Sequence, residues 1–90
     1  MSDNVTHPAH YAGDGKIDCM TAMRAMMHGV KSLVVSRVDG VARRAEMTCI
    51  IAAWWAMSFR YLWRWPRKNG VQDLRKCRQC IDFLIEEVDE

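Results

Sequence analysis

Cationic and aromatic side chains gather in one short stretch, FRYLWRWPRKNG, from Phe59 to Gly70. Arg60 and Arg64 are four residues apart, so on a helix they share one face. Guanidinium and ammonium groups bind phosphate, and aromatic rings stack on bases or on guanidinium planes. The stretch therefore predicts an anion site that suits a nucleotide. Its predicted ligand-binding side chains are Arg60, Tyr61, Arg64, Lys68 and Lys76.

The same cluster has a second interpretation. The helix dipole favours cations near a C-terminal helix end, whatever they bind. Aromatic residues on a helix usually face the core of the protein. Spacing alone leaves both interpretations open.

Two histidines, His7 and His10, precede the first expected helix in the sequence HPAHY. A histidine can hold a metal, donate to phosphate or move a proton near neutral pH. The pair fits closure of an N-terminal arm over a phosphate ligand, and it fits two surface histidines equally well.

The pair Cys77 and Cys80 forms a Cys-x-x-Cys spacing that, with the two histidines, would supply four zinc ligands. Cys77 lies on the apolar stripe of an expected helix, however, so two core-facing thiols are the favoured interpretation. The segment GDGK, Gly13 to Lys16, lacks the glycine and the hydroxyl residue that a P-loop needs.

Two carboxylates, Asp18 and Asp73, are expected in first helical turns near the basic cluster. Phosphoryl transfer normally uses a metal ion held by Asp or Glu. We therefore expect Asp18 or Asp73 to hold Mg²⁺, with His7, His10 and Asp73 as candidate catalytic residues. Each aspartate is equally explained as a residue favoured by the helix dipole.

These side chains must be positioned by helices, and the pattern predicts an all-α fold with three main helices. Residues 1–16 read as an irregular arm. Ser36 and Asp39 are expected to form a capping box before the second helix, and Asn69 and Gln72 are expected to form one before the third. The expected segments are a helix over Ile17–His28 with Asp14 as a possible N-cap, a helical or irregular connector over Val30–Gly40, a helix over Val41–Trp63, and a helix opening at Asn69 or Gly70.

Pro66 should end the second helix near Arg64, because proline disfavours helix at the residue before it and clashes with the preceding turn. Apolar residues recur at three- and four-residue steps from Val71 to Val88, which predicts one apolar stripe on the third helix. The short connection forces these two helices to lie antiparallel.

Size and composition predict one domain, 1–90, that assembles as a homo-oligomer. Half of its 90 residues are hydrophobic, more than a small helical monomer easily buries. A net charge of +2 gives no reason to expect nucleic acid as a partner. The apolar run CIIAAWWAM has half the length that spans a bilayer, about 18–20 residues. Four cysteines without a preceding signal peptide predict a reduced, cytoplasmic protein.

Several blocks together resemble the DUF3310 family of small phage and prophage proteins. The family pattern is His-Pro-x-His-Tyr, Gly-x-Ile-Glu, Lys-Tyr-x-x-Arg-x-Gly-x-Lys and Asp-Leu-x-Lys-Ala. The resemblance covers about half of the chain. The blocks here are VTHPAHY, GKIDCM, FRYLWRWPRK, DLRKC and IDFLIEE.

The resemblance implies a nucleotide-binding protein of phage or prophage origin, and it extends to the activity of a kinase of deoxynucleoside monophosphates without a P-loop. It adds Tyr11 to the polar signature and raises the weight of the anion-site interpretation. This chain has Arg60 where the family pattern has Lys, Met57 where the family commonly has Asn, and Pro66 where the pattern has Gly. The alternative is a non-enzymatic helical module that oligomerises or binds a protein partner.

Overall fold

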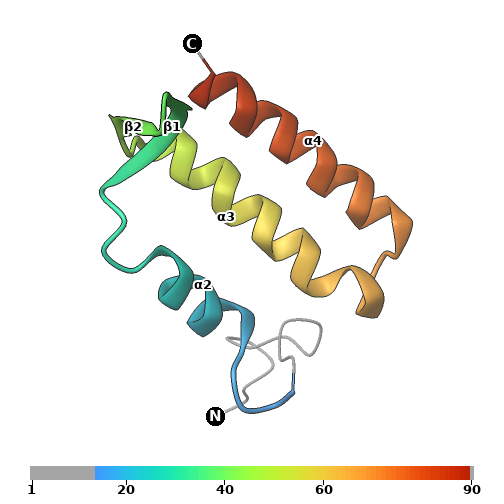
Figure 1. Ribbon diagram of the computed structural model, residues 1–90. Helices are drawn as coiled ribbons and strands as arrows, with labels where there is room; N and C mark the ends of the chain where they lie inside the picture. Colours follow the sequence, from blue (N-terminus) through green and yellow to red (C-terminus); the bar gives the residue numbers. More distant parts are fainter. Residues whose placement is uncertain (1–13, 90) are drawn as a thin grey trace.

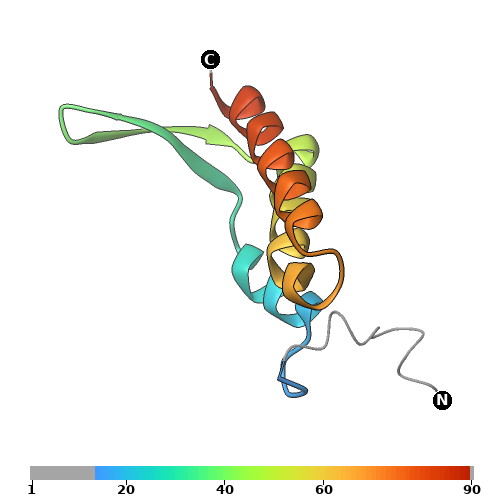
Figure 2. The ribbon, with the colours of Figure 1, turned by 90° about the vertical axis from the view of Figure 1, so that its right-hand side faces the viewer.

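A computed structural model describes residues 14–89 of the chain. Two long antiparallel helices lie side by side, a short helix lies beside the lower end of the pair, and a β-hairpin projects near the other end (Figures 1 and 2). The elements in chain order are α2 (Cys19–Met27), β1 (Ser32–Val38), β2 (Val41–Glu46), α3 (Cys49–Arg64), the 3-10 turn η2 (Trp65–Arg67) and α4 (Val71–Val88).

The antiparallel pair of α3 and α4 confirms the predicted helical hairpin. Thr48 caps α3 by accepting a hydrogen bond from the Ile51 amide at 3.2 Å. The helix ends at Arg64, and Pro66 lies in the following η2 turn, as predicted. The rings of Trp54 and Phe83 pack across the pair with 4.7 Å between their centroids.

The prediction of an all-α fold is wrong, because the described part of the chain contains an antiparallel two-stranded sheet and is α+β. The expected connector Val30–Gly40 contains β1, and the first turn and a half of the expected helix Val41–Trp63 is β2. The strands pair from Ser32↔Glu46 to Val38↔Val41, with an irregularity at Val35.

The turn residues explain this difference. Asp39 and Gly40 both have positive φ, 51° and 78°. A two-residue type I′ hairpin turn needs positive φ at both positions, and Asp-Gly is among its preferred sequences. Asp39 therefore turns the chain and does not form the predicted capping box with Ser36.

Two other predicted caps also differ. Asp18, and not Asp14, caps α2: its Oδ1 accepts from the Thr21 amide at 2.7 Å. Asp14 instead accepts from the amides of Lys16 and Ile17 in the turn before the helix. Gly70 is the N-cap of α4 and no side chain caps that helix, so the capping box predicted from Asn69 and Gln72 is not formed.

Gly40→Ala should weaken the hairpin. A Cβ at this position meets no atom within 4 Å, so the cost is purely conformational, about 1 kcal/mol for a left-handed alanine. Hydrogen exchange of the β1 and β2 amides should accelerate. Gly40→Asn, which tolerates positive φ, should stay near wild type. Equal acceleration in both variants would contradict this account of the turn.

Within residues 14–89, no helix has both the length and the apolar character that crossing a membrane requires.

Candidate functional site

The fold brings three of the predicted ligand-binding residues together on α3. Arg60, Tyr61 and Arg64, with Met57, line a hollow of about 70 Å³ at the C-terminal end of the helix. The Arg64 guanidinium carbon lies 4.8 Å from the centroid of the Tyr61 ring, within cation–π range. Four-residue spacing and the helical turn account for this convergence, as the sequence predicted.

Arg64 is held by a buried carboxylate from the facing helix. Its Nε donates to Asp73 Oδ2 at 3.2 Å, and its Nη2 donates to Asp73 Oδ1 at 3.4 Å. Asn69 Nδ2 adds a third hydrogen bond to Oδ1 at 3.1 Å. The Asp73 side chain is fully buried, while 13% of the Arg64 side chain is exposed. The pair fixes the guanidinium plane and joins α3 to the first turn of α4.

The protonation of Asp73 follows from these contacts. Desolvation by burial acts to raise its pKa, but hydrogen bonds from Asn69 and Arg64 and the charges of Arg64 and Lys76 outweigh burial. The net result is a pKa below the ordinary value of 3.8. Asp73 is therefore ionised at neutral pH and forms a true ion pair with Arg64.

The lowered pKa of Asp73 predicts that stability falls in acid. The carboxyl of the unfolded chain takes up a proton near 3.8, whereas the folded carboxyl resists until lower pH. The stabilising contribution is fully present above 3.8 and is lost as the pH falls through the folded pKa. Urea unfolding from about pH 6 down to about pH 2.5 measures this loss. Asp73→Asn should lack this part of the pH dependence, and an unchanged profile would contradict the assignment.

The start of α2 lies within electrostatic range of the same end of α3. Burial raises the pKa of the Cys19 thiol, while the charges of Arg60 and Arg64 act to lower it. Cys19 is fully buried at the first residue of α2, directly after the N-cap Asp18. Figure 1 shows α2 beside the C-terminal half of α3. The hollow therefore lies where α2 approaches α3.

The predicted cations Lys68 and Lys76, and the neighbouring Arg67 and Arg75, do not line the hollow. Lys76 acts electrostatically on Asp73, and Lys68 is exposed in the turn before α4. Arg67 donates to the Trp63 carbonyl at 2.9 Å, which caps the end of α3. Arg75 lines a separate hollow along α4, away from the hollow of Arg60. The predicted histidines His7 and His10, and Tyr11 with them, lie outside the described residues.

Of the two predicted magnesium ligands, Asp73 is already engaged by other side chains, and a magnesium role for Asp18 stays a prediction. Both oxygens of Asp73 accept hydrogen bonds from Arg64 and Asn69, and its side chain has no exposed surface. Asp18 uses an oxygen to cap α2. Among residues 14–89, no three His, Cys, Asp or Glu side chains are grouped to hold a metal ion. The geometry makes Asp73 a positioning residue for Arg64.

Cys77 and Cys80 are buried free thiols, which is the interpretation that the apolar stripe favoured. The Cys77 thiol donates to the Ser58 carbonyl at 3.3 Å. Burial raises the pKa of both thiols, so they stay protonated at neutral pH. Their role in the described structure is packing between α3 and α4.

Sequence reasoning missed Asn69 as a partner of Asp73, although the spacing of four residues was a signal for contact across one helical turn. Met57, identified only as a departure from the family pattern, lines the hollow. No family model, curated protein or solved structure matches the chain. The resemblance to the DUF3310 family therefore stays a prediction.

Proposed function

We propose that the hollow of Arg60, Tyr61 and Arg64 binds a phosphate group of a nucleotide. The observation that supports this most is that two arginines and a tyrosine line one hollow, with Arg64 held by the buried Asp73. A fixed guanidinium loses little freedom on binding, which strengthens its hydrogen bonds to an anion.

The size of the hollow defines which part of the ligand it takes. About 70 Å³ suits a phosphoryl group, whereas sites for whole small molecules have about 300–1,000 Å³. The sugar and base would lie outside the hollow, where the Tyr61 ring is a surface for stacking. Lys76 and Lys68, nearby in the chain, would add positive charge for further phosphate groups.

The enzymatic form of the proposal is transfer of the terminal phosphoryl group of a nucleoside triphosphate to a deoxynucleoside monophosphate. The monophosphate oxygen forms the new bond to phosphorus, and the nucleoside diphosphate leaves. Arginines suit this reaction because negative charge spreads over the moving phosphoryl oxygens. The resemblance to phage proteins implies this reaction, and four free cysteines support the reducing cytoplasm as its compartment.

Arg60→Ala should weaken nucleotide binding without unfolding the protein, because Arg60 is exposed on α3. The loss of one charged contact to phosphate should raise the Kd roughly 10–100-fold. Calorimetric titration with a panel of deoxynucleoside monophosphates, with and without Mg²⁺, measures the effect. A coupled assay with ATP as donor tests transfer in the same samples.

Arg75→Ala is the matched control. It also removes one exposed arginine, but Arg75 lines a different hollow on α4. Both variants lose one positive charge, which weakens nucleotide binding to the same extent. The proposal requires that Arg60→Ala weakens binding further and Arg75→Ala does not. No binding of any nucleotide by the wild-type chain, or equal weakening in both variants, would refute it.

A second candidate function is the non-enzymatic interaction module. It is favoured by large apolar side chains that stay exposed on every described helix and strand. Val41 at 66% and Val71 at 58% are among them. Exposure of this extent indicates a surface that another molecule covers.

A further inference from the structure

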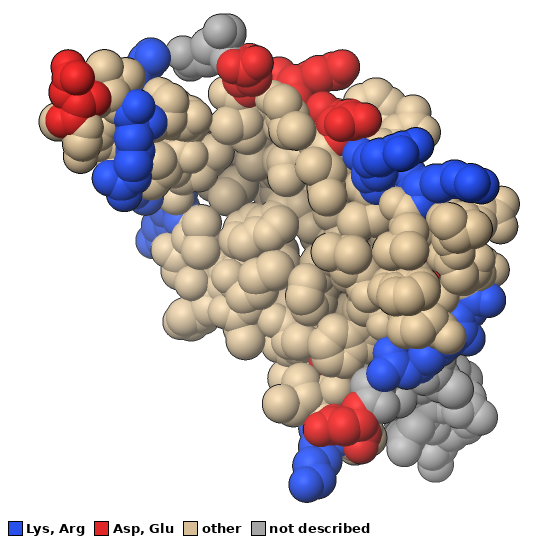
Figure 3. Space-filling view, turned by 45° about the vertical axis from the view of Figure 1, so that its right-hand side comes forward, with Lys and Arg blue, Asp and Glu red and all other residues tan. Residues whose placement is uncertain are grey.

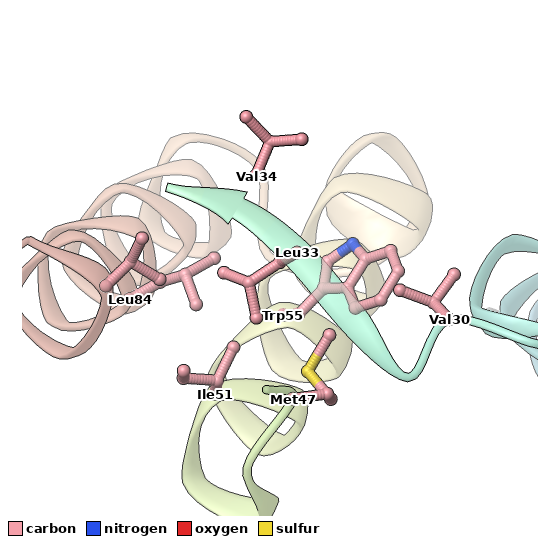
Figure 4. A pocket seen from close by; sticks show the side chains of 8 residues that line it. Val30, Leu33, Val34, Met47, Ile51, Trp55 and Leu84 are labelled. Carbon is pink, nitrogen blue, oxygen red and sulfur yellow. The ribbon is translucent and has the colours of Figure 1, made fainter. Parts of the chain in front are cut away.

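An apolar groove lies where the base of the β-hairpin meets α3 and α4. Its volume is about 270 Å³, and the side chains of Leu33, Met47, Ile51 and Trp55 surround a common space (Figure 4). Ile51 is buried, whereas the other residues that line the groove are half-buried or exposed. The groove is lined by Val30, Leu33, Val34, Met47, Ile51, Trp55, Leu84 and Val88.

The tip of the same hairpin carries an apolar pair. Val38 and Val41 face each other in the strand register, and they are 54% and 66% exposed. Figure 2 shows the hairpin extending away from the helices. A two-stranded hairpin alone is marginally stable in water, so a projecting one gains stability when another surface covers it.

Charge differs between the hairpin and the end of α4. Arg37 is exposed beside the hairpin tip, whereas Glu87 and Asp89 are exposed at the C-terminal end of α4. Asp89 also lines a second hollow with Val35 and Ile85, next to the groove. In Figure 3 a hollowed surface without charged groups runs across the visible face, and acidic side chains border its upper edge. Asp39 lies in the turn itself, but the hairpin as a whole carries three arginines, Arg37, Arg43 and Arg44, against two acids, Asp39 and Glu46. This net positive charge is complementary to the acidic edge.

We propose that the groove is occupied by the hairpin tip of a second copy of this chain. In a two-fold dimer each copy would insert Val38 and Val41 into the groove of its partner. Seven residues of β1 span about 20 Å, so two hairpins side by side in opposite directions place each tip at the base of the other. The contact is the same on both copies, as two-fold symmetry requires. This inference does not rest on the proposed nucleotide site.

Val41→Asp tests the inference in the full chain. Val41 is exposed in the single copy, so the substitution should leave the fold intact, which circular dichroism checks. Because a symmetric contact loses the valine twice, the dimer dissociation constant should rise on the order of 100-fold. Sedimentation equilibrium over a range of protein concentrations measures this constant.

Val71→Asp is the matched control. Val71 is 58% exposed, but it lies in the first turn of α4, at the end of the molecule away from the groove. Its dissociation constant should stay within a few-fold of wild type. Equal weakening by both variants would overturn the inference, because it would show general hydrophobic association.

A charge exchange gives a second test. Arg37→Glu and Asp89→Arg should each weaken the dimer, and the double variant should recover at least half of the loss in log Kd, since it restores opposite charges across the interface. Additive losses would overturn the proposed pairing. A wild-type chain that stays monomeric at all concentrations, or that binds duplex DNA through the hairpin as a monomer, would overturn the inference as a whole.

Discussion

Asp73→Asn should destabilise the protein by about 3 kcal/mol, because it leaves the Arg64 guanidinium largely buried without its counter-charge. Asp73 is fully buried and accepts hydrogen bonds from both Arg64 and Asn69. Breaking a buried pair on one side costs far more than losing an exposed pair, which contributes at most about 1 kcal/mol. For a small domain this is a large share of the total stability.

Urea unfolding followed by tryptophan fluorescence measures the loss. Asp82→Asn is the control: it makes the same chemical change on the exposed surface of α4 and should cost less than about 1 kcal/mol. The double variant Arg64→Met with Asp73→Leu should be more stable than Asp73→Asn, because it removes both charges together. Equal stability of Asp73→Asn and Asp82→Asn would refute the structural role of the ion pair.

The same ion pair connects stability to the proposed site. Asp73 orients Arg64, and Arg64 shares its hollow with Arg60 and Tyr61. A variant of Arg64 would therefore change folding and ligand binding together. Arg60 is the residue that separates the two effects, since it lines the hollow and is exposed.

The helical hairpin could be predicted because local sequence rules decide it. Pro66 stops α3 at Arg64, and the apolar stripe from Val71 to Val88 leaves α4 one face to bury. The short connection then requires antiparallel packing. None of these steps depends on residues far away in the sequence.

The strands were missed although the signal was present. The expected helix extends back to Val41, because the segment from Val41 to Trp63 contains neither Pro nor Gly. Asp39 and Gly40 supply the two positive φ values of a type I′ turn, and this local turn preference decides the pairing of Val38 with Val41. Turn chemistry therefore outweighs the absence of helix breakers.

Helix periodicity predicts which site residues share a helix face, and it predicts nothing further about the site. Arg60 and Arg64 share a face because four residues make about one turn. Arg75 lies two residues after Asp73, about 200° around α4, so it points away from the residues that Asp73 contacts. Lys76 lies about 300° on and stays near Asp73. The burial of Asp73 depends on tertiary packing, which the sequence pattern does not contain.

Trp54→Ala should cost about 3 kcal/mol of stability. Trp54 is part-buried, and its ring packs on Phe83 of the facing helix with a tilt of 33°. Removing a large aromatic side chain from a packed position loses its buried area and leaves a cavity. The contact joins the middle of α3 to the C-terminal half of α4, where no ion pair among the described residues connects the two helices. Thermal and urea unfolding should both show the loss.

Trp65→Ala separates the ring contact from the general effect of losing a tryptophan. Trp65 is 38% exposed in the η2 turn, so its removal should cost clearly less than that of Trp54. A double-mutant cycle of Trp54→Ala with Phe83→Ala should give a coupling of about 0.5–1.5 kcal/mol, the range for aromatic pairs. A coupling near zero would mean that Trp54 stabilises the protein through contacts other than the Phe83 ring, and that the two helices are held together without this ring pair.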